Sequence, residues 1–259
     1  MDNKEYYEQY EWSQIEHGDL DGKISNLLEL IPEEVSSIID IGCGNGVITN
    51  ELAGKFKILG VDRSAHALQY VKTDKLQASC DHIPLDDKSF DLVLSSEMLE
   101  HLDNQTLDGT IAEMKRLSRR FILLTVPNRE NLRKFSLKCP ECKKTFNHSY
   151  HLQSFSMKSI RTLFTGYSLI EGFTFGPGVR SYNRFLSNIK MRLTPSFAWY
   201  PYFAKKIRDE KTMCPFCETR FVHNYRFHLL AFGIDVLNVL ISAKRPYWIF
   251  MLFEKDAVK

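Results

Sequence analysis

Three glycines at alternating positions, Gly42, Gly44 and Gly46, directly follow residues 38–41, which are isoleucines apart from Asp40. The isoleucines of residues 38–41 leave no polar face, so we expect a buried strand there. Glycine lets a backbone turn tightly and lets a ligand approach where a Cβ would clash. The pattern therefore predicts a ligand-binding loop, followed by a helix at residues 47–55 whose first amide groups point at the ligand.

A second apolar segment, residues 57–62, ends in an acid sixteen residues after Gly46. In a nucleotide-binding α/β fold, a carboxylate at the position of Asp62 accepts hydrogen bonds from ribose hydroxyls. This alternation predicts an α/β fold with an open, mostly parallel sheet and helices on both faces. Further strands are expected at residues 76–80, 92–96 and 121–126, with a helix at 106–118.

This series of elements resembles the class I S-adenosylmethionine-dependent methyltransferases over residues 36–128, and through the last strands on to the C-terminus. The resemblance implies a Rossmann-like, doubly wound sheet that is mostly parallel and has an antiparallel terminal strand. It also implies S-adenosylmethionine as the cofactor and methyl transfer as the activity. A nicotinamide-dependent dehydrogenase has its loop spaced G-x-G-x-x-G, and here the third glycine comes one residue earlier.

The resemblance assigns cofactor-binding residues to several loops. Asp40 and the three glycines would hold the methionine end of the cofactor, and Asp62 its ribose. The turn at residues 79–81 would contact the adenine, although the family often has aspartate where this chain has Ser79. The full implied set is Asp40, Gly42, Cys43, Gly44, Gly46, Asp62, Arg63, Ser79, Cys80, Asp81 and Glu97.

The candidate catalytic residues are Glu97, Glu100 and His101, which would share one face of a helical turn at positions i, i+3 and i+4. One interpretation makes His101 a general base for a hydroxyl acceptor. A second makes all three ligands of Mg²⁺ or another divalent ion, with His148 or His151 as a further ligand. That E-x-x-E-H pattern resembles ubiquinone-pathway O-methyltransferases and the enzymes that methylate the terminal 2′-hydroxyl of small RNAs. In a third interpretation His101 is structural, as in methyltransferases without a metal that carry a similar segment.

Two C-P-x-C motifs, at residues 139–142 and 214–217, predict a metal site. A tight turn of this kind points both thiolates at one centre, and two turns make a four-sulfur tetrahedral zinc site with no open position for chemistry. A reducing cytosol disfavours disulfides, and neither motif has the βαβ context of a thioredoxin-type redox site. We expect structural zinc on Cys139, Cys142, Cys214 and Cys217, joining the loop after the fifth strand to an insertion.

The expected organisation has four parts. They are a helical cap at residues 1–35, a cofactor-binding core at 36–135, a cysteine-containing region at 136–246 and a terminal strand and tail at 247–259. The region at 136–246 would hold the last core helix (156–164), a strand (167–175) and a long insertion (176–246), before a closing strand at 247–254. Aromatic residues 6–12 predict a lid over the cofactor with Tyr10 or Trp12 facing it, or else an ordinary amphipathic cap.

The chain of 259 residues has a net charge of +2, but the charge is unevenly distributed. Residues 1–128 hold 12 lysines and arginines against 23 acids, whereas residues 129–259 hold 22 against 9. Each half could simply carry solvated charges, or the basic half could meet a phosphorylated sugar, a lipid headgroup or RNA. The basic, aromatic residues 185–206 suit a membrane interface or stacking on nucleic acid bases, with a buried or dimer-forming aromatic cluster as the alternative.

The sequence shows no secretory signal and no apolar run of the ~18 residues that a membrane span needs. The most apolar run, residues 227–243, contains Asp235 and Asn238 and is predicted as a buried helix. We therefore expect a cytoplasmic protein, with contact to a membrane surface as an option.

The predicted function is O-methylation of a small or lipid-linked anionic acceptor. One alternative is a methyltransferase acting on an RNA 2′-hydroxyl with a divalent metal at the E-x-x-E-H residues. Another is a relative that binds S-adenosylmethionine without turnover, although the complete glycine loop, Asp62 and residues 97–101 argue against it.

Overall fold

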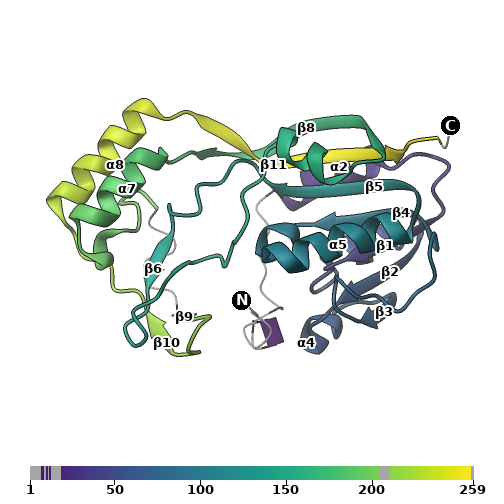
Figure 1. Ribbon diagram of the computed structural model, residues 1–259, viewed down its shortest axis with the longest axis horizontal. Coiled ribbons are helices and arrows are strands. Elements are labelled where there is room, and N and C mark those ends of the chain that lie inside the picture. The colour runs from purple at the N-terminus through teal and green to yellow at the C-terminus, as the bar shows by residue number, and fades with distance from the viewer. Residues whose placement is uncertain (1–6, 9, 11, 13–18, 205–210, 258–259) are drawn as a thin grey trace. The chain divides into compact units, whose positions relative to one another are not determined.

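The computed structural model describes residues 7, 8, 10, 12, 19–204 and 211–257 (Figure 1). The chain divides into two compact units, each of which is described by itself. The core unit holds the described residues up to Asn128 together with residues 155–177 and 246–257. The insert unit holds residues 129–154 and the described part of residues 178–245.

The core unit is built on a seven-stranded sheet. In spatial order its strands are β3 (Asp74–Gln77), β2 (Lys57–Asp62), β1 (Ser37–Ile41), β4 (Phe90–Ser96), β5 (Ser118–Pro127), β11 (Lys244–Lys255) and β8 (Tyr167–Arg180). The pairs formed among β1 to β5 are parallel, and β11 runs antiparallel to β5. The expected Rossmann-like sheet with an antiparallel terminal strand is confirmed.

Helices cover both faces of this sheet. Successive side chains of a strand point to opposite faces, so the residues of one strand divide between two cores. Ile39 and Ile41 of β1 pack in one core, which also holds residues of α5 (Asn104–Leu117) and α6 (Met157–Leu163). Ile38 belongs to a second core with residues of α2 (Leu20–Leu30) and α3 (Val47–Leu52). A strand buried on both sides has no place for a polar face, which is why the β1 segment is a nearly continuous apolar run.

The elements occur near their expected positions, with two notable shifts. The third strand is Asp74–Gln77 rather than residues 76–80, because β3 pairs with β2 only as far as Gln77 opposite Asp62. Ser79 then forms an isolated bridge with His82 in a turn. Helix α3 ends at Leu52 instead of residue 55, and the short helices α4 (Ala65–Leu68) and η2 (Leu99–His101) follow β2 and β4.

The insert unit contains two small hairpins and a pair of helices. The hairpins are β6 (Ser136–Lys138) with β7 (Thr145–Asn147), and β9 (Lys211–Met213) with β10 (Arg220–Val222). Helix α7 (Arg184–Leu193) packs against α8 (Leu229–Ile241) around a small apolar cluster that includes Leu186 and Ile234. The short helix η3 (Ser196–Ala198) follows α7.

The prediction that residues 227–243 form a buried helix is wrong for one side of that helix. Asp235 and Asn238 take the inward side of α8, and five apolar side chains remain exposed. Within the described part of the chain, no helix is both long and apolar enough to cross a membrane.

Asp91, the second residue of β4, holds the beginning of β1 in place. Its Oδ2 accepts hydrogen bonds from the backbone N–H and hydroxyl groups of both Ser36 and Ser37, and Arg119 donates to Oδ1. Partial desolvation raises the pKa of Asp91, but these hydrogen bonds outweigh it and hold the pKa well below its usual range.

We predict that Asp91→Ala lowers the free energy of unfolding by about 1–2 kcal/mol at pH 7, because the exposed and half-buried donors of Ser36, Ser37 and Arg119 lose a charged acceptor. Urea unfolding measures this, with exposed Asp86→Ala on the same loop as the control. A group with a lowered pKa stabilises the fold above its unfolded pKa, so the difference should shrink below about pH 4. Equal stability of the two variants would contradict this role.

Candidate functional site

The carboxyl ends of β1, β2 and β4 meet at one edge of the core-unit sheet, because these strands are parallel. The chain changes direction along the sheet between β1 and β4, which is where ligands bind in open α/β folds. The amides of Gly42 and Cys43 donate to Val61 O at 2.8 and 3.0 Å. Gly42 has φ +76°, and a Cβ there would lie 2.3 Å from Met98 Cγ. Only glycine fits at this turn.

Asp62 fixes the glycine loop from the end of β2. Its Oδ2 accepts from Gly44 N at 2.8 Å, and its Oδ1 accepts from Ser64 N at 2.9 Å. Burial raises the pKa of this carboxyl, while those two hydrogen bonds lower it. Since each carboxylate oxygen has two lone pairs, both retain capacity for the ribose hydroxyls that the resemblance implies.

A pocket opens between the glycine loop and the end of β4. Its lining is formed by Trp12, Leu20, Lys23, Asp40, Gly42, Cys43, Gly44, Asn45, Val47, Ile48, Ser96 and Glu97. The structure thus gathers Asp40, Gly42, Cys43, Gly44 and Glu97 from the predicted cofactor set around one cavity. The third glycine, Gly46, adopts a left-handed conformation as the N-cap of α3.

Asp40 is the electrostatic centre of this pocket. It is 2% exposed, and its Oδ2 accepts from the Thr49 hydroxyl at 2.7 Å. No group among the described residues hydrogen-bonds to its Oδ1. Burial is the main cause that raises the pKa of Asp40 to about 6, and the nearby Asp62 adds to the increase. A buried acceptor of this kind fits the cationic amino group at the methionine end of S-adenosylmethionine.

We predict that Asp40→Asn has opposite effects on stability and on cofactor binding. A raised pKa means that the ionised side chain opposes folding. The free energy of unfolding of the variant should therefore be higher than that of the wild type by on the order of 1–3 kcal/mol at pH 8. Most of the gain should be lost by pH 4, because the folded carboxyl is then protonated and the unfolded one is about half protonated. Cofactor affinity should fall about tenfold or more, because a charge-assisted hydrogen bond is lost.

Urea unfolding at the two pH values and calorimetric titration with S-adenosylmethionine measure these effects. Unchanged cofactor affinity, or the same stability change at pH 4 and pH 8, would contradict the role of Asp40.

Among the described aromatic residues near the N-terminus, Trp12 lies against the glycine loop. The Trp12 ring lies 3.0 Å from where a Cβ on Gly44 would be, and Asn45 Nδ2 donates to Trp12 O at 2.9 Å. Trp12 Nε1 donates to Tyr7 O, and the Tyr10 ring contacts the Trp12 ring with centroids 5.1 Å apart. Trp12, one of the two residues expected to face the cofactor, therefore lines the pocket.

Glu97 is held by residues that the sequence pattern did not indicate. Trp248 Nε1 donates to Oε2 at 2.9 Å, the Thr125 hydroxyl donates to Oε1 at 3.3 Å, and Lys23 Nζ lies 3.5 Å from Oε1. Lys23 is only 3% exposed and also lies over the Trp248 ring. A lysine in an amphipathic helix and a tryptophan in a terminal strand carry no local signal of such a contact.

The prediction that Glu97 shares a helical face with Glu100 and His101 is wrong. Glu97 has a left-handed backbone with φ +53°, and the helical turn η2 begins only at Leu99. Glu97 therefore lies outside the helical turn, and its carboxylate contacts Trp248 and Lys23. Glu100 is 1% exposed within the turn.

His101 contacts the N-terminal segment, with 2.9 Å between its Nδ1 and Tyr7 Oη. The Arg63 guanidinium lies over the Tyr7 ring, 5.5 Å from its centroid. His148 and His151 belong to the insert unit, where the Glu130 carboxylate pairs with His151 and burial lowers the pKa of His148 to about 4. Their expected role as a further metal ligand stays a prediction.

The turn expected to contact adenine does not contribute to the pocket lining. The Ser79 hydroxyl donates to the Asp81 carboxylate, which orders the turn. Burial raises the pKa of the Cys80 thiol, which is typical of a packed, unreactive cysteine. The roles of Ser79, Cys80 and Asp81 in adenine binding stay predictions.

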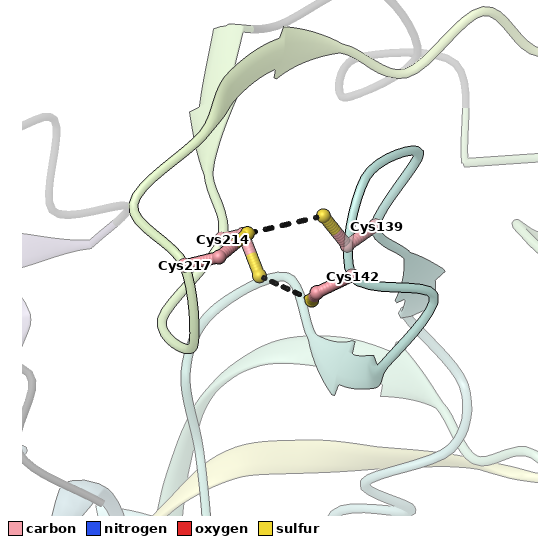
Figure 2. A group of neighbouring side chains, drawn as sticks. All are labelled: Cys139, Cys142, Cys214 and Cys217. Atoms are coloured by element: carbon pink, nitrogen blue, oxygen red, sulfur yellow. Dashed lines mark hydrogen bonds between the residues drawn. The ribbon is translucent and has the colours of Figure 1, made fainter.

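The insert unit holds the second candidate site, at which the two C-P-x-C turns face each other (Figure 2). The turns have equivalent geometry. Cys139 N donates to Lys144 O, and Cys214 N donates to Thr219 O, both at 2.9 Å. The residue after each motif, Lys143 or Glu218, is left-handed. Each turn closes its own hairpin, β6 with β7 or β9 with β10.

The four sulfur atoms fit a metal. The Sγ atoms are 3.6 Å apart between Cys139 and Cys217 and between Cys142 and Cys214, and all four lie within 4.8 Å of one another. A tetrahedral zinc with Zn–S bonds of ~2.3 Å needs sulfurs about 3.8 Å apart, whereas a disulfide needs ~2.05 Å. Burial raises the pKa of Cys214 to about 12, so a cation is required to keep all four sulfurs ionised.

We predict one zinc ion per chain, held by these cysteines. Cys217→Ser should lose the zinc and lower the melting temperature, because the site closes two hairpins that have little core of their own. Elemental analysis and thermal unfolding measure this, with Cys80→Ser as the control outside the cluster. A wild-type protein whose melting curve is unchanged by a strong chelator would contradict structural zinc.

A second pocket lies within the insert unit beside the first cysteine turn. It is lined by Lys138, Cys139, Pro140, Lys143, Ser196, Phe197, Phe221, Val222, His223 and Asn224. The two lysines provide ammonium groups, and the two phenylalanines provide apolar surface. Such a pocket can bind a molecule that combines an anionic group with an apolar or ring-shaped part.

Comparisons with known proteins agree with this geometry. Residues 39–120 match the model of a family described as "Methyltransferase domain". A search of the curated proteins finds no match.

Solved structures similar to this chain include three that cover most of it. A SAM-dependent methyltransferase from Archaeoglobus fulgidus has a TM-score of 0.56 at 14% identity, covering 91% of this chain and 93% of its own. The YcgJ protein from Bacillus subtilis has a TM-score of 0.54 at 14% identity, and the match covers 92% of this chain and 100% of YcgJ. A SAM-dependent methyltransferase from Methanosarcina mazei has a TM-score of 0.51 at 13% identity, and the match covers 89% of this chain and 96% of the Methanosarcina mazei chain. At these identities the likeness concerns the fold.

Proposed function

We propose that this chain is a class I S-adenosylmethionine-dependent methyltransferase that transfers the methyl group of this cofactor to an oxygen atom of a small or lipid-linked anionic acceptor. The match of residues 39–120 to a methyltransferase domain supports the methyl-transfer part. The observation that carries the methyl-transfer part is the pocket at the ends of β1 and β4, with its glycine loop and the unpaired Oδ1 of Asp40. The glycine loop would admit the cofactor backbone, Asp40 would bind its amino group, and Asp62 its ribose.

Bound S-adenosylmethionine supplies an electrophilic methyl group on a cationic sulfur. Displacement at that methyl requires mainly that the acceptor atom be aligned with it and kept from water. Trp12 covers the glycine loop, and Glu97 is fixed by Trp248 and Lys23 at the end of β4. These rigid contacts would define the side of the pocket from which an acceptor approaches.

An oxygen acceptor needs a base, and His101 is our candidate. Its ring is oriented by the 2.9 Å contact between Nδ1 and Tyr7 Oη. In the tautomer in which Nδ1 donates to Tyr7, Nε2 carries the lone pair that a general base uses. Tyr7 would then be a positioning residue, because it would select this tautomer of His101.

The charge of the insert unit supports an anionic acceptor. Residues 129–154 and 178–245 contain 18 lysines and arginines against 6 acids. Lys138 and Lys143 place two of these charges on the lining of the insert-unit pocket. A phosphate or carboxylate on the acceptor would be attracted to such a surface.

The alternative acceptor, an RNA 2′-hydroxyl with a divalent metal, has less support. It needs Glu97 as a metal ligand beside Glu100 and His101, and the Glu97 carboxylate is already engaged by Trp248, Thr125 and Lys23. A relative that binds the cofactor without turnover is the other alternative, and it would retain this pocket without a functioning base.

The test is to incubate the pure protein with methyl-labelled S-adenosylmethionine and a cell lysate separated into RNA, protein, lipid and small polar molecules. We expect label in the lipid or small-molecule fraction. Asp62→Ala should abolish labelling because the glycine loop loses its anchor, and His101→Ala should reduce the rate at least about a hundredfold, within the range typical of a lost general base.

Label in RNA would overturn the proposed acceptor class. Labelling by His101→Ala within a few-fold of the wild-type rate would make this histidine structural. Cofactor binding without label in any fraction would favour the relative without turnover.

A further inference from the structure

Helix α8 of the insert unit presents an apolar face to the outside. Five side chains define this α8 face, and they are exposed to 76%, 47%, 45%, 77% and 57% in the order Leu229, Leu230, Leu237, Leu240 and Ile241. At 3.6 residues per turn these positions fall within about one third of the helix circumference. A continuous exposed apolar stripe of this kind marks an interaction surface.

The inward side of α8 carries a buried ion pair beside its apolar residues, and this ion pair keeps the helix in its orientation. Lys190 Nζ lies 2.7 and 2.8 Å from the two carboxylate oxygens of Asp235, and both side chains are 2% exposed. Tyr182 Oη and Tyr202 N also donate to this carboxylate. Rotating α8 to bury its leucines would leave Lys190 as an unpaired buried charge, which is strongly unfavourable.

Two aromatic residues extend the α8 face at the helix N-terminus. Phe203 and Phe227 are 54% and 59% exposed, and their rings lie 6.1 and 5.7 Å from the Phe232 ring. Most other aromatic residues in 185–206 are less exposed, and Tyr200 is fully buried. Phe185 and Leu193 of α7 are also exposed, to 70% and 63%, so segment 185–206 adds separate exposed apolar side chains, whereas α8 carries a stripe of five.

The chain segments that form α7 and α8 and follow the second cysteine turn are predominantly basic. Among residues 178–204 and 219–245 the one acid is Asp235, which is paired internally with Lys190. The exposed basic residues of these segments are Arg184, Arg192, Arg220, Arg226, Lys244 and Arg245. Arg226 precedes the exposed Phe227, and Lys244 and Arg245 follow the end of α8.

We propose that the α8 face docks on the surface of a bilayer that contains anionic phospholipids. The leucines and phenylalanines would enter the boundary between headgroups and acyl chains, and the flanking arginines and lysines would contact lipid phosphates. A second copy of the chain is a poorer occupant, because a symmetric contact would place Arg226, Lys244 and Arg245 against their own like charges. Docking is independent of the methyl-transfer reaction and of the acceptor's identity.

Vesicle flotation of the full chain tests this proposal. We expect the protein to float with vesicles of phosphatidylcholine and phosphatidylglycerol, to bind pure phosphatidylcholine weakly, and to dissociate as salt is added. The double variant Leu237→Glu/Leu240→Glu should bind at least about a hundredfold more weakly, because two apolar groups are lost from the contact and two negative charges are added. Ile170→Glu, at a 49% exposed position of β8 in the core unit, is the matched control and should float normally.

A second variant, Lys244→Gln/Arg245→Gln, should weaken binding about tenfold or more without changing an apolar residue, since each charge contributes roughly a factor of five at an anionic surface. Thermal unfolding checks that each variant folds. The proposal is overturned by a wild-type protein that stays unbound at low salt, or by a leucine variant that binds like the Ile170 control. A wild-type dimer that the leucine substitutions dissociate, with no vesicle binding, would show that a second copy covers the face.

Discussion

The hydrogen bonds from Gly42 N and Cys43 N to Val61 O are the contacts on which the candidate active site depends. They join the glycine loop to the end of β2, and Asp62 completes this junction by accepting from Gly44 N. Because β1, β2 and β4 are parallel, Asp40, Asp62 and Glu97 then lie at the same edge of the sheet. A loop of this shape needs left-handed backbone at alternate residues, which is why glycine recurs there.

Two buried aspartates show how the same side chain can indicate binding or stability. Asp235 is surrounded by Lys190 and further donors, so its charge is compensated inside the insert unit and orients α8. Asp40 receives one hydroxyl hydrogen bond, and burial raises its pKa more than that bond and the charge of Lys23 lower it. The difference lies in the partners, so burial alone does not distinguish a structural carboxylate from one that awaits a ligand.

The insert unit combines a metal-type cluster with a surface of exposed apolar and basic residues. Its two hairpins have short strands of three residues each, which bury little apolar surface. Zinc would therefore supply stability that the core of this unit cannot, as is common for small structural units. The helices α7 and α8 are held by the ion pair of Lys190 with Asp235, which leaves the α8 face exposed.

The sequence alone determined the buried strands, the glycine loop and the two cysteine turns, because each depends on local residue types at short spacing. Buried strands need apolar runs, tight turns need glycine, and a C-P-x-C turn places its own two sulfurs. Tertiary structure decided what the other side chains meet. It gave Glu97 itself a left-handed backbone, which takes it out of the helical turn of Glu100 and His101, and it brought Lys23 and Trp248 to the Glu97 carboxylate from distant segments. It also placed the polar Asp235 on the buried side of α8 and five apolar residues on the exposed side, the reverse of what the composition suggests. Hydropathy cannot predict this, because it does not show that Asp235 will pair with the distant Lys190.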